Sequence, residues 1–180
     1  MKIGTCVNFS EIDGMGKKFA RLREHNFDSC QLVSWNPAAW TDENASLLKT
    51  LLEQYQITVS AFWCGWSGPA AWNFYDGPLT LGLVPVEYRQ MRIENLCDGA
   101  DFAHKLGITD VVTHMGFIPE NPYDPNFSSF CIAVRTVAEH LKKNGQCLLF
   151  ETGQETPVTM LRCFEAVSYT HLRAHETRGN

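Results

Sequence analysis

Short apolar segments alternate with longer amphipathic segments along the chain, in an order that few folds accommodate. The apolar segments cover residues 2–7, 29–33, 57–63, 110–114 and 147–151, and the amphipathic segments cover 15–24, 41–55, 86–106, 128–144 and the residues from 156 on. Five strand and helix pairs in this order predict a parallel sheet with helices outside it, either a doubly wound sheet or a (βα)8 barrel. The stretch NFSEIDGMG after the first strand lacks the GxGxxG spacing of a dinucleotide-binding sheet, so the barrel is favoured.

The chain is shorter than a complete barrel of this kind. It has 180 residues, of which 44% are hydrophobic and 19% charged, which is enough for a sizeable core. A (βα)8 barrel takes roughly 250 residues and eight units, whereas five units are present. We therefore expect an α/β fold in which residues 1–167 form the N-terminal part of a TIM barrel.

The alternation stops after residue 167, and the chain ends with SYTHLRAHETRGN. His171 and His175 have the spacing of a metal-binding pair on a helix, with Glu176 next to them. The string closely resembles the translated read-through of a sequencing adaptor that recurs at the ends of gene predictions. We expect residues 168–180 to be a non-native tail and leave them out of the fold prediction.

Charge and cysteine content exclude several classes of function. The net charge of −5 disfavours nucleic-acid binding, which needs clustered lysine and arginine. No window reaches the roughly 18 apolar residues of a membrane span, and the N-terminus MKIGTCVNF has no signal-peptide core. The seven cysteines are scattered without a CxxC pair, as in proteins of a reducing compartment, so we expect a cytoplasmic location without nucleic-acid or membrane partners.

Two polar residues end neighbouring strands of the predicted barrel. His114 closes the strand DVVTH and Glu151 closes the strand CLLFE. Since the carboxyl ends of barrel strands surround the active site, both side chains should point into one mouth. A carboxylate and an imidazole suit a divalent ion or general acid/base catalysis. Gln154 and Glu155, directly after the strand, are expected to contact the substrate.

The connection after the third strand, CGWSGPAAWNFYDGPLTLGLVP, is long for a compact domain, and such loops are usually functional. We expect Trp66, Trp72 and Phe74 to contact substrate as the apolar walls of a lid. Its hinges would be Gly65, Gly68 and Gly77. Asn8 and Trp35, just beyond the first two strands, are weaker candidates by position alone.

Three motifs together, FWCGWSGPAAWNFYDGPLTLGLVP, VVTHMGFIPENP and LLFETGQET, resemble the sugar phosphate isomerase/epimerase family of the xylose-isomerase-like barrel superfamily. The resemblance covers residues 1–167. It implies a (βα)8 barrel with one divalent metal ion (Mn, Mg, Co or Zn), with Glu151 as metal ligand and proton carrier and His114 at the substrate or metal site. The family's other ligands, an Asp, a His and a Glu from strands six to eight, match nothing here, so the resemblance implies an incomplete metal site in this chain.

The function that the resemblance implies is a metal-dependent isomerase or epimerase acting on a keto sugar or sugar phosphate through an enediolate. Its partner would be a small-molecule sugar, and the oligomeric state is left open. A keto-inositol dehydratase would use the same scaffold and Glu151. A DNA-repair endonuclease is disfavoured, because the third strand ends Phe62-Trp63-Cys64 without a histidine. The remaining alternative is that the chain, as a fragment, is inactive alone.

Overall fold

The computed structural model describes residues 3–167 and 172–175, and for 172–175 the backbone alone. The strands are β1 (Gly4–Asn8), β2 (Ser29–Ser34), β3 (Thr58–Cys64), β4 (Asp110–His114), β5 (Cys147–Glu151) and β6 (Leu172–His175). The helices are α1 (Met15–Glu24), the 3-10 helix η1 (Pro37–Ala39), α2 (Asp42–Tyr55), α3 (Gly77–Thr80), α4 (Val86–Lys105), α5 (Pro125–Lys143) and α6 (Pro157–Val167).

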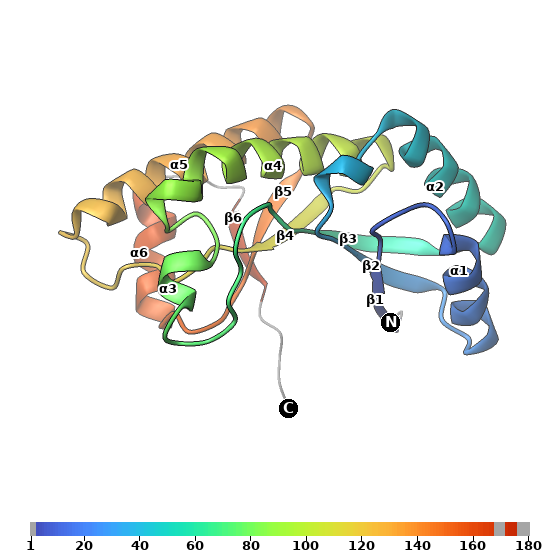
Figure 1. Ribbon diagram of the computed structural model, residues 1–180, viewed down its shortest axis with the longest axis horizontal. Helices are drawn as coiled ribbons and strands as arrows, with labels where there is room; N and C mark the ends of the chain where they lie inside the picture. Colours follow the sequence, from blue (N-terminus) through green and yellow to red (C-terminus); the bar gives the residue numbers. More distant parts are fainter. Residues whose placement is uncertain (1–2, 168–171, 176–180) are drawn as a thin grey trace.

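All neighbouring strands pair in parallel, and the order in the sheet is the order in the sequence, from β1 to β6. The sheet is curved and open, with β1 and β6 as its outer strands (Figure 1). A parallel sheet with sequential strand order and helices outside it is the arrangement of a TIM barrel. The prediction of a partial barrel is therefore confirmed. The doubly wound alternative does not fit, because the strand order follows the sequence.

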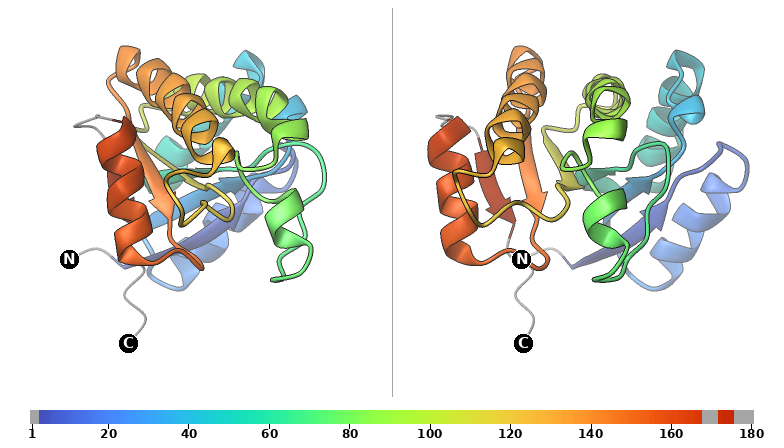
Figure 2. Two further views of the ribbon diagram at one scale, coloured as in Figure 1. Left: turned by 90° about the vertical axis from the view of Figure 1, so that its left-hand side faces the viewer. Right: turned by 60° about the vertical axis from the view of Figure 1, so that its left-hand side comes forward.

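Alternate residues of each strand face opposite sides of the sheet, and the two sides differ. One side packs on the helices in a large core, where Phe62 of β3 and Phe150 of β5 meet helix residues such as Phe19 and Phe130. The other side is the interior of the partial barrel, with a small cluster around Ala61, Trp63, Val112 and Leu149. Figure 2 shows the helices along the outside of the curved sheet. Side chains at the carboxyl ends of the strands that belong to this inner face therefore meet one another.

Local signals set most helix boundaries. The Thr41 hydroxyl oxygen accepts a hydrogen bond from the Asn44 backbone N–H (3.2 Å), so the predicted cap of α2 is confirmed. Gly107 ends α4 in a left-handed conformation with φ of 75°, also as predicted. Helix α5 starts three residues before the predicted start at Ser128, because Asp124 caps the Asn126 N–H (2.8 Å) and Pro125 takes the first helical position.

Strand β6 falls within the expected non-native tail, and the prediction from sequence included no strand there. It pairs with β5 from Leu148↔Leu172 to Glu151↔His175. Ladder hydrogen bonds join backbone groups, so this pairing needs no particular side chains. Residues 168–171 and 176–180 lie outside the described residues, and the non-native origin of the tail stays a prediction.

Candidate active site

Glu151 ends β5 with its side chain half-buried on the inner face of the sheet. Its Cα is in register with that of His114 at the end of β4, so the two predicted site residues are neighbours across the ladder. The Glu151 Oε2 atom accepts a hydrogen bond from the indole Nε1–H of Trp63 (2.9 Å). Trp63 lies on β3, two strands away, and reaches Glu151 across the interior of the partial barrel.

His114 is buried, with 4% of its surface exposed. Its Nδ1 atom accepts a hydrogen bond from the Gly116 backbone N–H (3.1 Å), so Nδ1 carries no proton. The neutral ring therefore has its proton on Nε2, which leaves Nε2 as the donor in the side-chain hydrogen bond with Gln154. Burial lowers the pKa of His114, an effect that the hydrogen bond with Gln154 opposes. Both ring nitrogens are thus engaged in the neutral form.

The segment after β5 folds back over His114. A Cβ added to Gly153 would lie 2.7 Å from His114 Nε2, so the close approach requires glycine. The Gly153 backbone N–H donates to Glu155 Oε2 (3.1 Å), and Gln154 Nε2 donates to Glu155 Oε1 (3.0 Å). A continuous set of hydrogen bonds therefore joins His114, Gln154 and Glu155.

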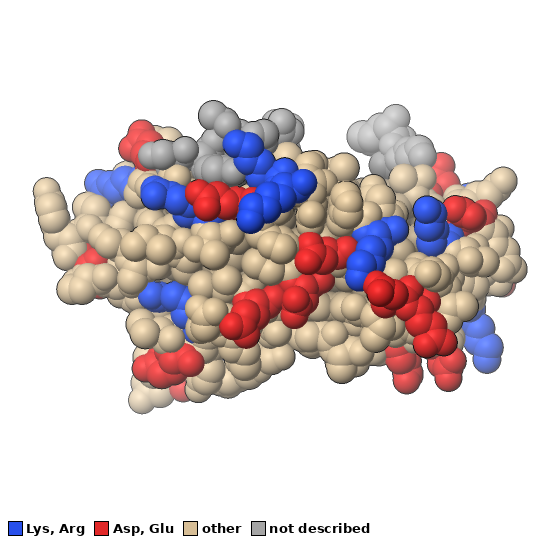
Figure 3. All heavy atoms as spheres, turned by 90° about the horizontal axis from the view of Figure 1, so that it is seen from above, with Lys and Arg blue, Asp and Glu red and all other residues tan. Residues whose placement is uncertain are grey.

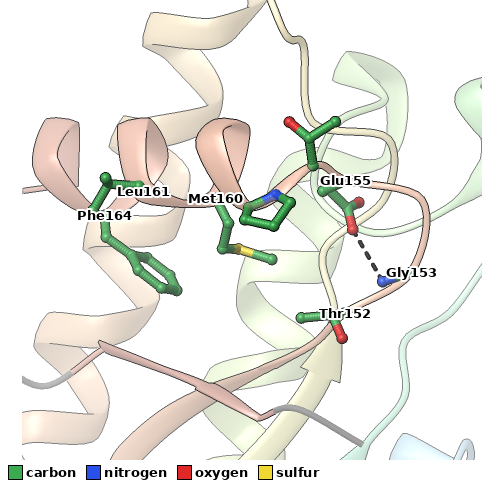
Figure 4. A pocket seen from close by; sticks show the side chains of 8 residues that line it. Thr152, Gly153, Glu155, Met160, Leu161 and Phe164 are labelled. Carbon is green, nitrogen blue, oxygen red and sulfur yellow. Dashed lines mark hydrogen bonds between the residues drawn. The ribbon is translucent and has the colours of Figure 1, made fainter. Parts of the chain in front are cut away.

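Glu155 is a second carboxylate, on the segment that follows β5. Burial raises its pKa, although backbone N–H groups, including those of Gly153 and Ile118, act in the opposite direction. Its side chain points back to the Gly153 N–H, and both residues line a cavity of about 350 Å³ (Figure 4). Met160 and Phe164 of α6 form the apolar wall of this cavity. Since Glu151, His114 and the tryptophans do not line it, the cavity is separate from the barrel mouth.

Four of the five tryptophans gather at the carboxyl ends of β2 and β3. Trp35 is central, with ring centroids 4.8 Å from Trp63, 5.0 Å from Trp66 and 6.1 Å from Trp72. Trp72 in turn stands edge-on to His114, with ring centroids 5.0 Å apart, and is 55% exposed. We call Trp35, Trp63, Trp66 and Trp72 the tryptophan cluster. It gives the mouth an apolar wall beside the two predicted site residues.

Two buried arginines of α4 fix the long loop that carries Trp66 and Trp72. The guanidinium of Arg92 donates to the carbonyl oxygens of Ser67 (3.3 Å), Gly82 (2.7 Å) and Pro69 (2.8 Å). Arg89 donates to the carbonyl oxygens of Leu83 and Val84, both 2.6 Å away. Both ends of the loop are therefore tied to α4, and only the part between residues 70 and 81 lies beyond these ties.

Two of the three predicted hinge glycines, Gly65 and Gly77, are required by close packing. A Cβ on Gly65 would lie 2.6 Å from Trp35, and a Cβ on Gly77 would lie 2.6 Å from Phe117. Among the three predicted hinges, Gly68 alone has a positive φ, of 90°. Gly82, which sequence reasoning did not single out, has a φ of 64°, and its Cβ would overlap the Met115 carbonyl group. The loop is thus docked directly on the end of β4.

Most of the predicted site residues come together. Glu151, His114, Gln154 and Glu155 form one connected group, and Trp72 contacts it. Trp66 is buried inside the tryptophan cluster. Phe74 is 82% exposed and packs on Phe117, outside the tryptophan cluster. Asn8 ends β1, where its backbone carbonyl accepts a hydrogen bond from Lys18 Nζ (2.6 Å).

Trp63 and its contact with Glu151 were not predicted, and Trp35 was only a weak candidate. The sequence feature that could have identified Trp63 is the alternation of side chains along β3, which places Trp63 on the same face as Ala61. That face becomes the barrel interior once the neighbouring strands are in place. The length of an indole then allows a contact across two strands, which adjacency along the sequence does not reveal.

Glu151 is the predicted metal ligand among the residues present, and one of its two oxygens is held by Trp63. Among the residues whose side chains the structure describes, 3–167, no group of three or more His, Cys, Asp or Glu could hold a metal. Trp63 occupies Oε2 of Glu151, so Oε1 is available, and both nitrogens of His114 are engaged. The chemistry of a carboxylate oxygen fits a divalent ion, but a complete ligand set is not present in this part of the chain.

Residues 19–173 match the model of a family described as xylose isomerase-like TIM barrel. A xylose isomerase domain protein from Planctomyces limnophilus superposes with a TM-score of 0.86 at 26% identity, covering 94% of this chain and 60% of that one. A xylose isomerase-like TIM barrel protein from Mycobacterium smegmatis, in complex with magnesium, gives 0.68 at 20% identity, covering 91% and 56%. An L-ribulose 3-epimerase gives 0.72 at 19% identity, covering 97% and 60%.

The chain thus spans about 60% of the length of these solved structures. No curated protein matches the chain. The likeness at 19–20% identity concerns the fold alone. Of the described helices, none is long and apolar enough to cross a membrane.

Proposed function

The chain belongs to the xylose isomerase-like TIM barrel family, and we propose that the protein of which it forms the N-terminal part is an isomerase or epimerase of keto sugars. The observation that carries this proposal is the pairing of Glu151 and His114 at the ends of neighbouring strands, with Glu155 and the tryptophan cluster beside them. The solved epimerase structures with the same fold support the substrate class.

The proposed reaction moves a proton on the carbon next to the substrate carbonyl. Trp63 holds the Oε2 atom of Glu151 by a hydrogen bond. The other oxygen, Oε1, would accept this proton. Glu155 lines the cavity beside α6, and both of its oxygens accept hydrogen bonds from the segment that carries it, so we propose a substrate contact for it and not the proton return. The neutral His114, with Nε2 on Gln154, keeps the segment that carries Glu155 in place.

One divalent ion belongs to the proposal, with Glu151 as a ligand. When bound, such an ion supplies Lewis acidity at the substrate carbonyl. Mn, Mg, Co and Zn all accept carboxylate oxygen, and the magnesium complex of the Mycobacterium smegmatis protein supports a divalent ion in this proposal. The other ligands would come from strands that complete the barrel.

The tryptophan cluster would bind the apolar face of the sugar. Indole rings present a large rigid apolar surface and exclude water from the reacting atoms. Trp72, which is more than half exposed and stands next to His114, is the ring that a sugar would meet first. Phe74 packs on Phe117 and is 82% exposed, so we propose a smaller part for it than for Trp66 and Trp72.

We propose that the protein acts in the cytoplasm and on a small-molecule substrate. All seven cysteines are free, which agrees with a reducing compartment. On the helix face shown in Figure 3, lysine and arginine alternate with aspartate and glutamate, and no continuous basic patch covers the described residues of that face. This distribution supports a partner other than nucleic acid.

Exchange of substrate hydrogen with solvent tests the proposed function. A panel of ketoses is incubated in D2O with Mn²⁺, and NMR follows deuterium uptake at the carbon next to the carbonyl. We expect uptake by a version of the chain completed with the remaining barrel strands, its loss on chelation, and its recovery when Mn²⁺ is restored.

The 180-residue chain alone, and the completed version carrying Glu151→Gln, are expected to give no uptake above background. Ordinary exchange rates from the 180-residue chain alone would contradict the incomplete site. Loss of water from a keto-inositol in the same assay would favour the dehydratase alternative.

A further inference from the structure

We propose that Trp63 is a positioning residue that fixes the orientation of the Glu151 carboxylate, so that one oxygen is held by the protein and the other faces the reacting atoms. This inference rests on the proposed function for its catalytic meaning. The contact itself rests on the structure, because the Trp63 indole N–H donates to Glu151 Oε2 at 2.9 Å.

The contact joins elements that are not neighbours. Trp63 and Glu151 are 88 residues apart, on β3 and β5, with β4 between them. Both side chains project from the inner face of the sheet, where Ala61, Val112 and Leu149 form the floor beneath them. An indole has one N–H and no acceptor, so this ring can serve Glu151 only as a donor.

Packing holds the Trp63 ring in this orientation. Trp63 is 7% exposed and contacts Trp35, at 4.8 Å and 37° between ring planes, and Trp66, at 6.1 Å and 34°, and these two rings also contact each other at 5.0 Å. Trp35 is itself pressed against Gly65, where a Cβ would come within 2.6 Å. A buried ring that is held by two neighbouring rings in contact with each other cannot turn its N–H away without displacing them. The donor is therefore in place before any substrate arrives.

The consequence for Glu151 is that its two oxygens have different roles, one bound to Trp63 and the other left for the reaction. A carboxylate at the end of a strand can otherwise turn about its side-chain torsions, and catalytic groups need orientation within about 10–20°. With Oε2 held by the indole, Oε1 is the oxygen left for a metal ion or for the substrate proton. Glu151 should accordingly act through a single oxygen.

Trp40 provides a matched control for this inference. It is also a buried tryptophan whose Nε1–H donates to a side-chain oxygen, Ser34 Oγ at 2.8 Å, but it packs on Phe62 in the helix-side core. Trp40→Phe and Trp63→Phe therefore remove the same kind of hydrogen bond while keeping an aromatic ring. Both should lower the midpoint of thermal unfolding, whereas only Trp63→Phe should change Glu151.

The first test uses NMR of the 180-residue chain. The indole N–H resonance of Trp63, assigned by its loss in Trp63→Phe, should shift in Glu151→Ala and exchange with solvent about tenfold faster or more, as expected for loss of a hydrogen bond to a charged group. In Trp63→Phe, the three-bond couplings of the Glu151 side chain should change from those of one rotamer to averaged values. In Trp40→Phe these couplings should stay as in the parent chain.

The second test measures kinetics in the deuterium-exchange assay with the completed barrel. Trp63→Phe is expected to lower kcat by about tenfold or more while KM changes less than about twofold, because the variant loses orientation and not substrate contact. Trp40→Phe should keep both constants. Unchanged Glu151 couplings in Trp63→Phe, or an effect on KM alone, would overturn the inference. Absence of exchange by the parent protein would instead refute the proposed function, and the NMR result would still decide the Trp63 contact.

Discussion

At the scale of single residues, the structure gives the two predicted strand-end residues different surroundings. Glu151 is half-buried with one oxygen held by Trp63, while His114 is buried with both ring nitrogens engaged. The expectation of catalytic roles for both stays a prediction. Their surroundings suit Glu151 to proton transfer and His114 to holding the Gln154 and Glu155 segment in place.

Stability should depend on pH through His114. Burial lowers its pKa in the folded protein below the ordinary value of 6.5, so the unfolded chain binds this proton more tightly. The stabilising contribution is therefore present above pH 6.5 and is lost as the pH falls below it, by at most about 1.4 kcal/mol per pH unit. Urea unfolding at a series of pH values should show a shallower acid loss in His114→Gln than in the parent.

His104 provides the control, because it is an exposed histidine in the last turn of α4. His104→Gln should keep the acid slope of the parent chain. If His114→Gln kept that slope too, the buried neutral state of His114 would be wrong.

At the scale of elements, the loop between β3 and α4 makes contacts that its sequence did not predict. Its length and aromatic content indicated a lid with glycine hinges. The lid stays a prediction, and the structure shows both ends of the loop tied to Arg89 and Arg92, with Gly82 pressed against the end of β4. These arginines lie on a helix that reads as ordinary amphipathic sequence, and the carbonyl groups they bind are invisible to side-chain patterns.

Helices and strands were far more predictable, because their signals are local. The predicted bounds of α1, β4 and β5 are those of the structure, and the cap at Thr41 is confirmed. The start of α5 at Pro125 was missed although Asp124-Pro125 is a regular helix-start signal. Contacts across the barrel interior, such as that of Trp63 with Glu151, depend on strand register and are not encoded in any one segment.

Two glycine substitutions can test the docking of the loop on β4. Gly82 and Gly107 both have a positive φ, of 64° and 75°, but a Cβ on Gly82 would lie 1.9 Å from the Met115 carbonyl carbon, whereas Gly107 has nothing within 4 Å. Gly107→Ala should cost about 1 kcal/mol of the free energy of unfolding, from backbone conformation alone. Gly82→Ala should cost about 3 kcal/mol or more, because the loop must move off β4.

Denaturant titration measures both free energies, and limited proteolysis reports on the loop. Gly82→Ala should open the loop to cleavage between residues 70 and 81, whereas Gly107→Ala should not. Equal losses of stability in the two variants would contradict the docking of the loop.

At the scale of the whole molecule, the sheet is open at both sides. Strands β1 and β6 each have one neighbour, and Gly4, Thr5 and Cys6 of β1 are exposed. Sequence counting predicted this partial barrel, because five units cannot close a fold that needs eight. The sixth strand was not predicted, since the residues after 167 were excluded as a tail.

Open edges should make the chain associate at raised concentration. Unpaired backbone groups of an edge strand pair readily with another chain, and a charge on the edge opposes this. Cys6→Lys on β1 should therefore reduce association. Leu47→Lys, which makes the same charge change at an exposed position of α2, should not. Sedimentation velocity at several concentrations distinguishes the two, and equal behaviour of both variants would point to a surface other than the edge.

The tryptophan cluster also gives the protein an optical signature. Four indoles lie in the mouth, each with its ring centroid 4.8 to 6.1 Å from at least one other, and one of them is hydrogen-bonded to a carboxylate; Trp40 alone is elsewhere. Near-ultraviolet circular dichroism and fluorescence of this chain therefore come mostly from the mouth, while the far-ultraviolet signal comes from all helices. A ligand that enters the mouth should change the near-ultraviolet circular dichroism and the fluorescence but leave the far-ultraviolet signal unchanged. Binding can therefore be detected without an added dye.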